Sequence, residues 1–127
     1  MPGETSGIEE ELHAHVLKHC SPRDPVMNEL IAESRALGGI SMMQIAEEQA
    51  GLRTRLVSAR NAVEVGTFTG LSALAIARGL APGGRLLCCD VSEDWTAIAR
   101  RAWQRALVAE RVALKIASAP GRLVGAW

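Results

Sequence analysis

The chain has 127 residues, of which 48% are hydrophobic, and its 14 basic and 14 acidic side chains leave no formal net charge. This length suits one domain, and the balanced charge argues against a nucleic-acid-binding surface and against a polybasic membrane anchor. With one phenylalanine, three tryptophans and no tyrosine, the chain also lacks the aromatic side chains of a base-stacking platform.

The N-terminal stretch MPGETSGIEEEL is polar and acidic and does not have the pattern of a signal peptide. No apolar run approaches the roughly 20 residues that cross a bilayer. The three cysteines, Cys20, Cys88 and Cys89, form neither a CxxC pair nor an even set, so they suit a reducing compartment. We therefore expect a cytoplasmic protein that contacts neither a membrane nor nucleic acid.

Residues 1–60 are predicted to form an N-terminal helical segment. Apolar residues recur at helical spacing over 8–19 and predict a helix with Ile8, Leu12 and Val16 near one face. The same spacing predicts a second helix over 25–37, separated from the first by the break at Asp24-Pro25. A third helix is predicted from Ala46 to about Arg60.

From Asn61 onward, short strand patterns alternate with helical patterns. Ser92 is well suited to cap the helix that follows it, because its hydroxyl can accept a hydrogen bond from the first turn. Alternation with short turns is typical of a parallel sheet in an α/β fold of the doubly wound kind. The predicted strands cover residues 61–66, 85–91 and 111–117, and the predicted helices cover 69–80 and 92–107.

The sequence VEVGTFTG, residues 63–70, places a carboxylate just before a glycine turn at the end of the first strand. In doubly wound folds, ligands bind outside the carboxyl ends of the strands. Gly66 would let the backbone approach a ligand closely, and Gly70 would let the next helix begin tightly against the sheet. Asp90, at the end of the second strand, could accept two hydrogen bonds from a ribose diol.

The loop chemistry favours an adenosyl ligand over a dinucleotide. A dinucleotide site uses GxGxxG so that bare backbone holds a pyrophosphate at a helix N-terminus. Here the spacing is GxxxG with Phe68 inside it, and the Glu64 carboxylate would repel a pyrophosphate. An ammonium and a sulfonium would instead be attracted, as in S-adenosylmethionine. A purely structural turn between strand and helix remains an alternative.

The stretch EVGTFTGLSALAIARGLAPGGRLLCCDVSEDWTAIARRAW resembles the cofactor-binding core of the catechol and caffeoyl-CoA O-methyltransferase family, and MMQIAEEQAGL resembles an upstream stretch of the same family. The resemblance covers roughly residues 40–119. It implies a Rossmann-like class I methyltransferase fold, of which the chain holds the N-terminal and cofactor-binding part. Residues 61–119 would be the S-adenosylmethionine-binding core, and 120–127 a short tail where the fold is apparently truncated.

The resemblance also assigns roles to ten residues. Glu64, Gly66 and Thr67 would line the methionine end of S-adenosylmethionine, and Ser72 would bind its carboxylate. Asp90 would hold the ribose hydroxyls. Val91 and Ala119 would contact the adenine, Met43 and Gln44 would close over the cofactor, and Phe68 would either shield the sulfonium or pack in the core.

Catalysis in the resembled family also uses a divalent metal, usually magnesium, which lowers the pKa of the acceptor hydroxyl. The family's metal ligands lie on later strands, and no aspartate follows Asp94 in this chain. We therefore expect an O-methyltransferase for a small, catechol-like hydroxylated acceptor, with no metal ligands and no catalytic residue identified here. Alternatives are a truncated, catalytically impaired cofactor-binding fragment or partner subunit, and a nucleotide-binding oxidoreductase. The family is often dimeric, which leaves a homodimer open.

Two further groups of residues are better explained by the structure than by a functional role. His15 and His19 are four residues apart, but no acidic or third ligand accompanies them, so a solvated helix face is expected rather than a metal site. Cys88 and Cys89 lie in a predicted strand, where a buried cysteine behaves as a small hydrophobic residue.

Overall fold

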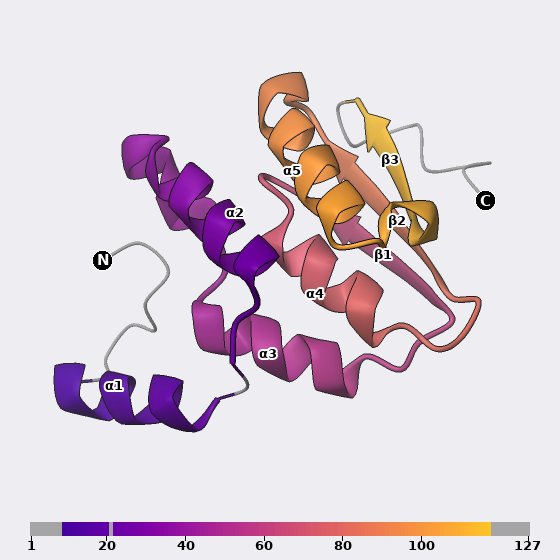
Figure 1. Ribbon diagram of the computed structural model, residues 1–127. Coiled ribbons are helices and arrows are strands. Elements are labelled where there is room, and N and C mark those ends of the chain that lie inside the picture. The colour runs from indigo at the N-terminus through magenta and orange to yellow at the C-terminus, as the bar shows by residue number, and fades with distance from the viewer. Residues whose placement is uncertain (1–8, 21, 118–127) are drawn as a thin grey trace.

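A computed structural model describes residues 9–20 and 22–117 of the chain. Within these residues, three parallel strands form one sheet in the order β1-β2-β3. Figure 1 shows α4 and α5 on one face of this sheet, with α2 beside α5 and α3 beside α4. The strands are β1 (Asn61–Val65), β2 (Arg85–Asp90) and β3 (Val112–Ile116), and the α-helices are α1 (Glu10–His19), α2 (Pro25–Arg35), α3 (Glu47–Leu56), α4 (Leu71–Gly79) and α5 (Glu93–Arg105).

The sequence prediction of an α/β fold with three parallel strands and flanking helices is confirmed. Strand β2 lies in the middle and is buried from Leu86 to Asp90, because it has a neighbour on each side. Its residues Leu86 and Cys88 face the helices and belong to the main hydrophobic core. The two cysteines of β2 are both buried and free, as their interpretation as small hydrophobic residues requires.

Capping side chains explain where two of the helices begin. The Asp24 carboxylate accepts a hydrogen bond of 2.9 Å from the Met27 amide, and Pro25 takes the first helical position of α2, where no amide donor is needed. The Ser92 hydroxyl accepts a bond of 3.2 Å from the Trp95 amide at the start of α5, which confirms the predicted cap.

Some predicted boundaries were wrong. The third helix ends at Leu56 and not near Arg60, because Ser58 turns to a left-handed φ of +40° and donates its amide to Gly79 O at 2.9 Å. The segment Gly38–Met43, for which no element was predicted, forms a 3₁₀ helix, η1, and a second one, η2, covers Ala109–Arg111. The other helices and strands were predicted to within a few residues of their ends.

The first helix is observed close to its predicted range, but its apolar face is not buried. Helix α1 buries none of its residues, and Leu12 is 54% exposed. Ile8 lies outside the described residues. His15 and His19 stack with ring centroids 4.2 Å apart, and the described residues contain no group of three or more potential metal ligands.

The main core joins the N-terminal helices to the sheet. It contains Leu30 and Ile31 of α2 and Ala50 of α3 together with residues of α4, β2 and α5. Helices α3 and α4 pack so closely that a Cβ added to Gly79 would lie 2.6 Å from Thr54 O. Among the described helices, none combines the length and the apolar character that a membrane crossing would need.

Candidate functional site

The candidate site lies at the carboxyl ends of β1 and β2, where the loop of residues 66–70 leads into α4 (Figure 1). The loop is tied to the second strand by a hydrogen bond of 2.8 Å from Gly66 N to Cys89 O. The carboxyl ends of parallel strands lie at the same edge of a sheet. The parallel pairing of Val65 with Cys89 therefore brings Asp90 beside this loop. The predicted meeting of glycine loop and acid is therefore observed.

The two glycines of the loop have different roles. Gly66 has a φ of +85° and nothing within 4 Å of the place where a Cβ would stand, so its surface is open for a ligand to approach. Gly70 has a φ of +89°, and an added Cβ would lie 2.6 Å from Ala99 Cβ and 2.9 Å from Trp103 Nε1. Its carbonyl accepts a bond of 3.3 Å from that same indole nitrogen. Gly70 thus allows the loop to pack against α5.

Glu64 is half-buried and carries a carboxylate that the protein does not fully satisfy. Its Oε1 atom is buried without a hydrogen-bond partner, and so is the hydroxyl oxygen of Thr67. Burial raises the pKa of Glu64 above its ordinary value, and the Ser72 hydroxyl and the positive charge of Arg53 offset part of this effect. Unpaired buried polar atoms are uncommon in folded proteins and indicate a missing partner.

Ser72 stands in the first turn of α4, where the helix dipole favours an anion. Its hydroxyl accepts a hydrogen bond from Nη1 of Arg53, which reaches across from the last turn of α3. Sequence reasoning did not identify Arg53, because nothing in the pattern of residues 46–60 distinguishes it from the neighbouring arginines.

Asp90 is 7% exposed and holds the loop by its carboxylate. Oδ2 accepts a bond of 2.7 Å from Phe68 N, while Oδ1 accepts bonds of 2.6 Å and 3.0 Å from the amides of Val91 and Ser92. A carboxylate oxygen has room for two hydrogen bonds, so Oδ2 retains one position for a ligand hydroxyl. Asp90 therefore has a structural role that its sequence position did not reveal.

The aromatic residue of the loop packs inside the protein. Phe68 is 4% exposed and adopts a φ of +52°, an uncommon conformation that its amide bond to Asp90 helps to hold. Its ring meets Trp95 edge to face at a centroid distance of 5.1 Å. Of the two roles expected for Phe68, core packing is the one the contacts describe. Val91, in contrast, is 68% exposed beside the site.

The two upstream residues that the resemblance places over the cofactor lie at the end of η1 and just beyond it. Met43 is 54% exposed. Gln44 donates from Nε2 to Ser34 Oγ at 2.9 Å, and this hydroxyl in turn lies 2.6 Å from the Thr69 hydroxyl of the loop. The chain of hydrogen bonds links η1 and α2 to the glycine loop, and sequence reasoning missed it. Ala119 lies outside the described residues.

These residues fit the amino-acid end of S-adenosylmethionine. The unpartnered Oε1 of Glu64 has the chemistry to accept from an ammonium, the Ser72 hydroxyl has the chemistry to donate to a carboxylate, and Gly66 leaves space above the loop. A magnesium ion has no comparable set of ligands, since no cluster of three or more His, Cys, Asp or Glu side chains occurs in residues 9–20 and 22–117.

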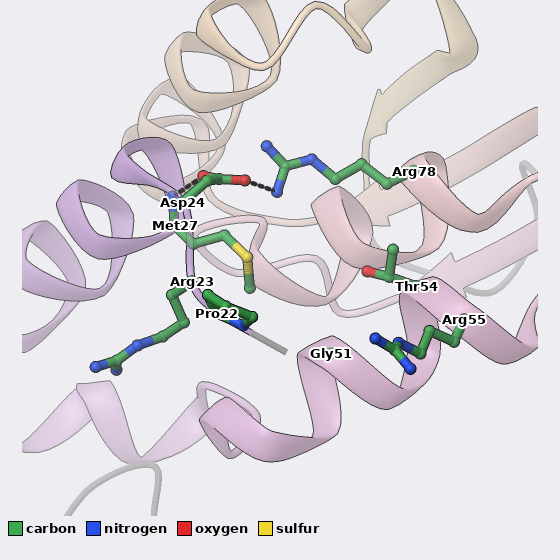
Figure 2. A pocket seen from close by; sticks show the side chains of 8 residues that line it. All are labelled: Pro22, Arg23, Asp24, Met27, Gly51, Thr54, Arg55 and Arg78. Atoms are coloured by element: carbon green, nitrogen blue, oxygen red, sulfur yellow. Dashed lines mark hydrogen bonds and ion pairs between the residues drawn. The ribbon is translucent and has the colours of Figure 1, made fainter. Parts of the chain in front are cut away.

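A separate hollow of about 360 Å³ lies at the other end of α4. Figure 2 shows Asp24 and Arg78 pointing toward one another at its rim, where they form an ion pair. The hollow is lined by Pro22, Arg23, Asp24, Met27, Gly51, Thr54, Arg55 and Arg78. None of the residues expected to bind the cofactor lies among them.

Comparison with known proteins gives consistent matches. The sequence profile of a family described as O-methyltransferase matches residues 17–124. The chain is 39% identical over 80 residues to catechol O-methyltransferase domain-containing protein 1 of Mus musculus, covering 61% of this chain and 30% of that protein. It is 31% identical over 105 residues to probable caffeoyl-CoA O-methyltransferase 1 of Dictyostelium discoideum, covering 80% and 46%.

The solved structures agree with the sequence matches. The O-methyltransferase from Bacillus cereus in complex with SAH superposes with a TM-score of 0.74 and 28% identity, over 84% of this chain and 49% of that one. The resemblance to catechol and caffeoyl-CoA O-methyltransferases, and the Rossmann-like class I fold that it implied, are thereby confirmed. The chain spans half or less of the length of these relatives.

Proposed function

Because the chain belongs to the O-methyltransferase family, we propose that it binds S-adenosylmethionine at the carboxyl ends of β1 and β2 and takes part in methyl transfer to a hydroxyl group. The observation that carries the proposal is the buried Oε1 atom of the half-buried Glu64, which has no hydrogen-bond partner among the described residues. Glu64 stands two residues before Gly66, whose surface is open, and the ammonium of a ligand bound there would satisfy the carboxylate.

The parts of the cofactor would be divided among the residues around the loop. Glu64 and Thr67 bind the ammonium, Ser72 binds the carboxylate at the start of α4, and Gly66 admits the methionine chain close to the backbone. The remaining lone pair of Asp90 Oδ2 accepts a ribose hydroxyl, and the exposed Val91 side chain packs on the adenine. The roles of Met43, Gln44 and Ala119 remain those that the resemblance implied.

In the reaction itself, an acceptor oxygen attacks the methyl carbon, a C–O bond forms as the C–S bond breaks, and the hydroxyl proton leaves to a base or to water. S-adenosylhomocysteine is the other product. The names of the relatives support a catechol-like or other small hydroxylated acceptor. A magnesium ion, where one takes part, would lower the pKa of that hydroxyl. The free thiols of Cys20, Cys88 and Cys89 support a cytoplasmic location, and a homodimer remains part of the proposal.

The test is a calorimetric titration of the purified chain with S-adenosylmethionine and, separately, with NAD. We expect the adenosyl donor to bind and NAD to show no saturable heat, because the Glu64 carboxylate repels a diphosphate. A catechol assay with magnesium then measures transfer of a labelled methyl group.

The outcomes separate the parts of the proposal. Donor binding with turnover supports both parts, and donor binding without turnover retains the cofactor site but removes methyl transfer by this chain. Binding of NAD alone would overturn the proposal in favour of the oxidoreductase alternative.

A further inference from the structure

Arg53 brings a guanidinium within hydrogen-bonding distance of Ser72, one of the expected cofactor residues. It belongs to the last turn of α3 and is half-buried, and its Nη1 atom donates to Ser72 Oγ on α4. Of its five N–H donors, the described contacts use one. The remaining donors lie beside a serine that stands at the N-terminal end of a helix.

Arg53 and Glu64 form a pair of opposite charges around Ser72. The positive charge of Arg53 is close enough to act on the Glu64 carboxylate, and Ser72 lies near both side chains. Arg53 nevertheless does not satisfy Glu64, since Oε1 of Glu64 remains without a partner. A donor cluster and an unsatisfied acceptor thus lie side by side.

An α-amino acid carries the matching pair of charges, an ammonium and a carboxylate on one carbon. Glu64 offers an acceptor to the first, and Arg53 with Ser72 offers donors to the second. A guanidinium matches the planar geometry of a carboxylate and can bind both of its oxygens. At a partly buried position, such a charge-assisted bond is stronger than one on an open surface.

We propose that Arg53 binds the α-carboxylate of the methionine part of the cofactor, together with Ser72, and that this contact makes the site selective for ligands with an intact amino-acid group. The inference rests on the proposed function, because it concerns the same pocket. It adds a ligand-binding residue from α3, so the N-terminal helical segment contributes directly to the cofactor site.

The test uses two ligands that differ in the amino-acid group. S-adenosylhomocysteine has it, and 5′-methylthioadenosine lacks it. In Arg53→Ala, we expect the dissociation constant of S-adenosylhomocysteine to rise about 10- to 100-fold, in line with the loss of one charge-assisted contact. The dissociation constant of 5′-methylthioadenosine should stay within about twofold of wild type, and Arg53→Lys should recover part of the lost affinity.

Arg55 provides the matched control. It lies two residues later on α3, is exposed and lines the separate hollow of Figure 2. Arg55→Ala removes the same charge from the same helix and should leave both dissociation constants unchanged.

Two results would overturn the inference while leaving the proposed function in place. One is unchanged binding of S-adenosylhomocysteine in Arg53→Ala, and the other is an equal loss for both ligands, which would mark a structural role. Should the alanine variant fail to fold, decarboxylated S-adenosylmethionine is titrated against wild type. Affinity equal to that of S-adenosylmethionine would then overturn the inference. A wild-type chain that binds none of these ligands would overturn the proposed function as well.

Discussion

At the scale of single residues, Glu64 combines a cost to stability at neutral pH with the role that we propose for it in ligand binding. Its side chain is half-buried with an unpartnered Oε1 atom, and burial raises its pKa in the folded chain. The folded state therefore holds the Glu64 proton more tightly than the unfolded state does. The stability that this residue contributes is present below the unfolded pKa and is lost as the pH rises through the folded pKa.

This linkage predicts the effect of Glu64→Gln on stability. Glutamine resembles the protonated acid, so the variant and the wild type should melt at similar temperatures near pH 4. At pH 7 the variant should be the more stable, because it buries no charge. Thermal unfolding at the two pH values measures the difference, and Glu110→Gln, at an exposed acid away from the site, is the control. A gain that is equal at both pH values would contradict the account.

The position of Gly70 leads to a second prediction at the scale of single residues, which concerns stability. An alanine there would combine a left-handed φ of +89° with a contact of 2.6 Å to Ala99 Cβ. We expect Gly70→Ala to lower the free energy of unfolding by about 2 to 5 kcal/mol. Denaturant unfolding measures this loss.

Gly83 is the control for Gly70. It has a φ of +75° but nothing within 4 Å of an added Cβ, so Gly83→Ala should cost only about 1 to 2 kcal/mol. Equal losses at both positions would show that packing against α5 is not what requires Gly70.

The site residues that sequence reasoning identified owe their positions to the ends of strands, whereas those that it missed owe theirs to tertiary packing. Glu64, Gly66 and Asp90 lie at or beside the carboxyl ends of strands, so their meeting could be predicted from local pattern and from the family resemblance. Arg53 reaches the site only because α3 packs on α4, and the Ser34–Thr69 hydrogen bond joins residues 35 positions apart. Contacts of this kind depend on tertiary packing, which a single sequence does not specify.

At the scale of elements, the start of α2 has two functions in one short sequence. Asp24-Pro25 was interpreted as a helix break, and it is also the cap and first position of the next helix. Burial alone would raise the pKa of Asp24, but the Met27 amide and the Arg78 guanidinium outweigh this effect and lower it. The Asp24 contribution to stability is therefore present above the unfolded pKa and is lost as the pH falls through the folded value.

Asp24→Ala should lower the free energy of unfolding by about 1 kcal/mol at pH 7, because an amide of the first turn loses its partner. The loss should shrink as the pH falls through the folded pKa of Asp24. Asp24→Asn keeps an effective cap and removes only the ion pair with Arg78, so it should be nearly neutral. An Asn variant as unstable as the Ala variant would show that the ion pair, and not the cap, sets the stability.

Helix boundaries were the least predictable part of the elements. The residues Val57–Ala59 have no strong breaker, yet they leave the helix because Ser58 N and Ala59 O bond to residues at the end of α4. The apolar residues of α1 resemble a buried face in sequence, although α1 buries none of them. Periodicity indicates which side of a helix can be buried, but only the packing of neighbours decides whether it is.

At the scale of the whole molecule, β1 is paired only with β2 within the described residues. Its Val63 and Val65 side chains are 49% and 60% exposed. An exposed apolar strand at a sheet edge favours pairing with another chain. We therefore expect the 127-residue chain to self-associate as its concentration rises.

Light scattering over a range of concentrations measures this association. Val63→Lys should reduce it, since a charge on an edge strand opposes pairing. Leu12→Lys changes an exposed apolar residue on α1 and should have little effect. A monomer at all concentrations would contradict the prediction.

The whole account depends on the carboxylate at position 64 receiving a positively charged methyl donor, and the affinity of Glu64→Gln for S-adenosylmethionine tests this most directly. Calorimetry at pH 7 should show a dissociation constant about 10- to 100-fold above that of wild type, because a charge-assisted contact with the ammonium is lost. An unchanged dissociation constant in a folded Glu64→Gln variant would contradict the account.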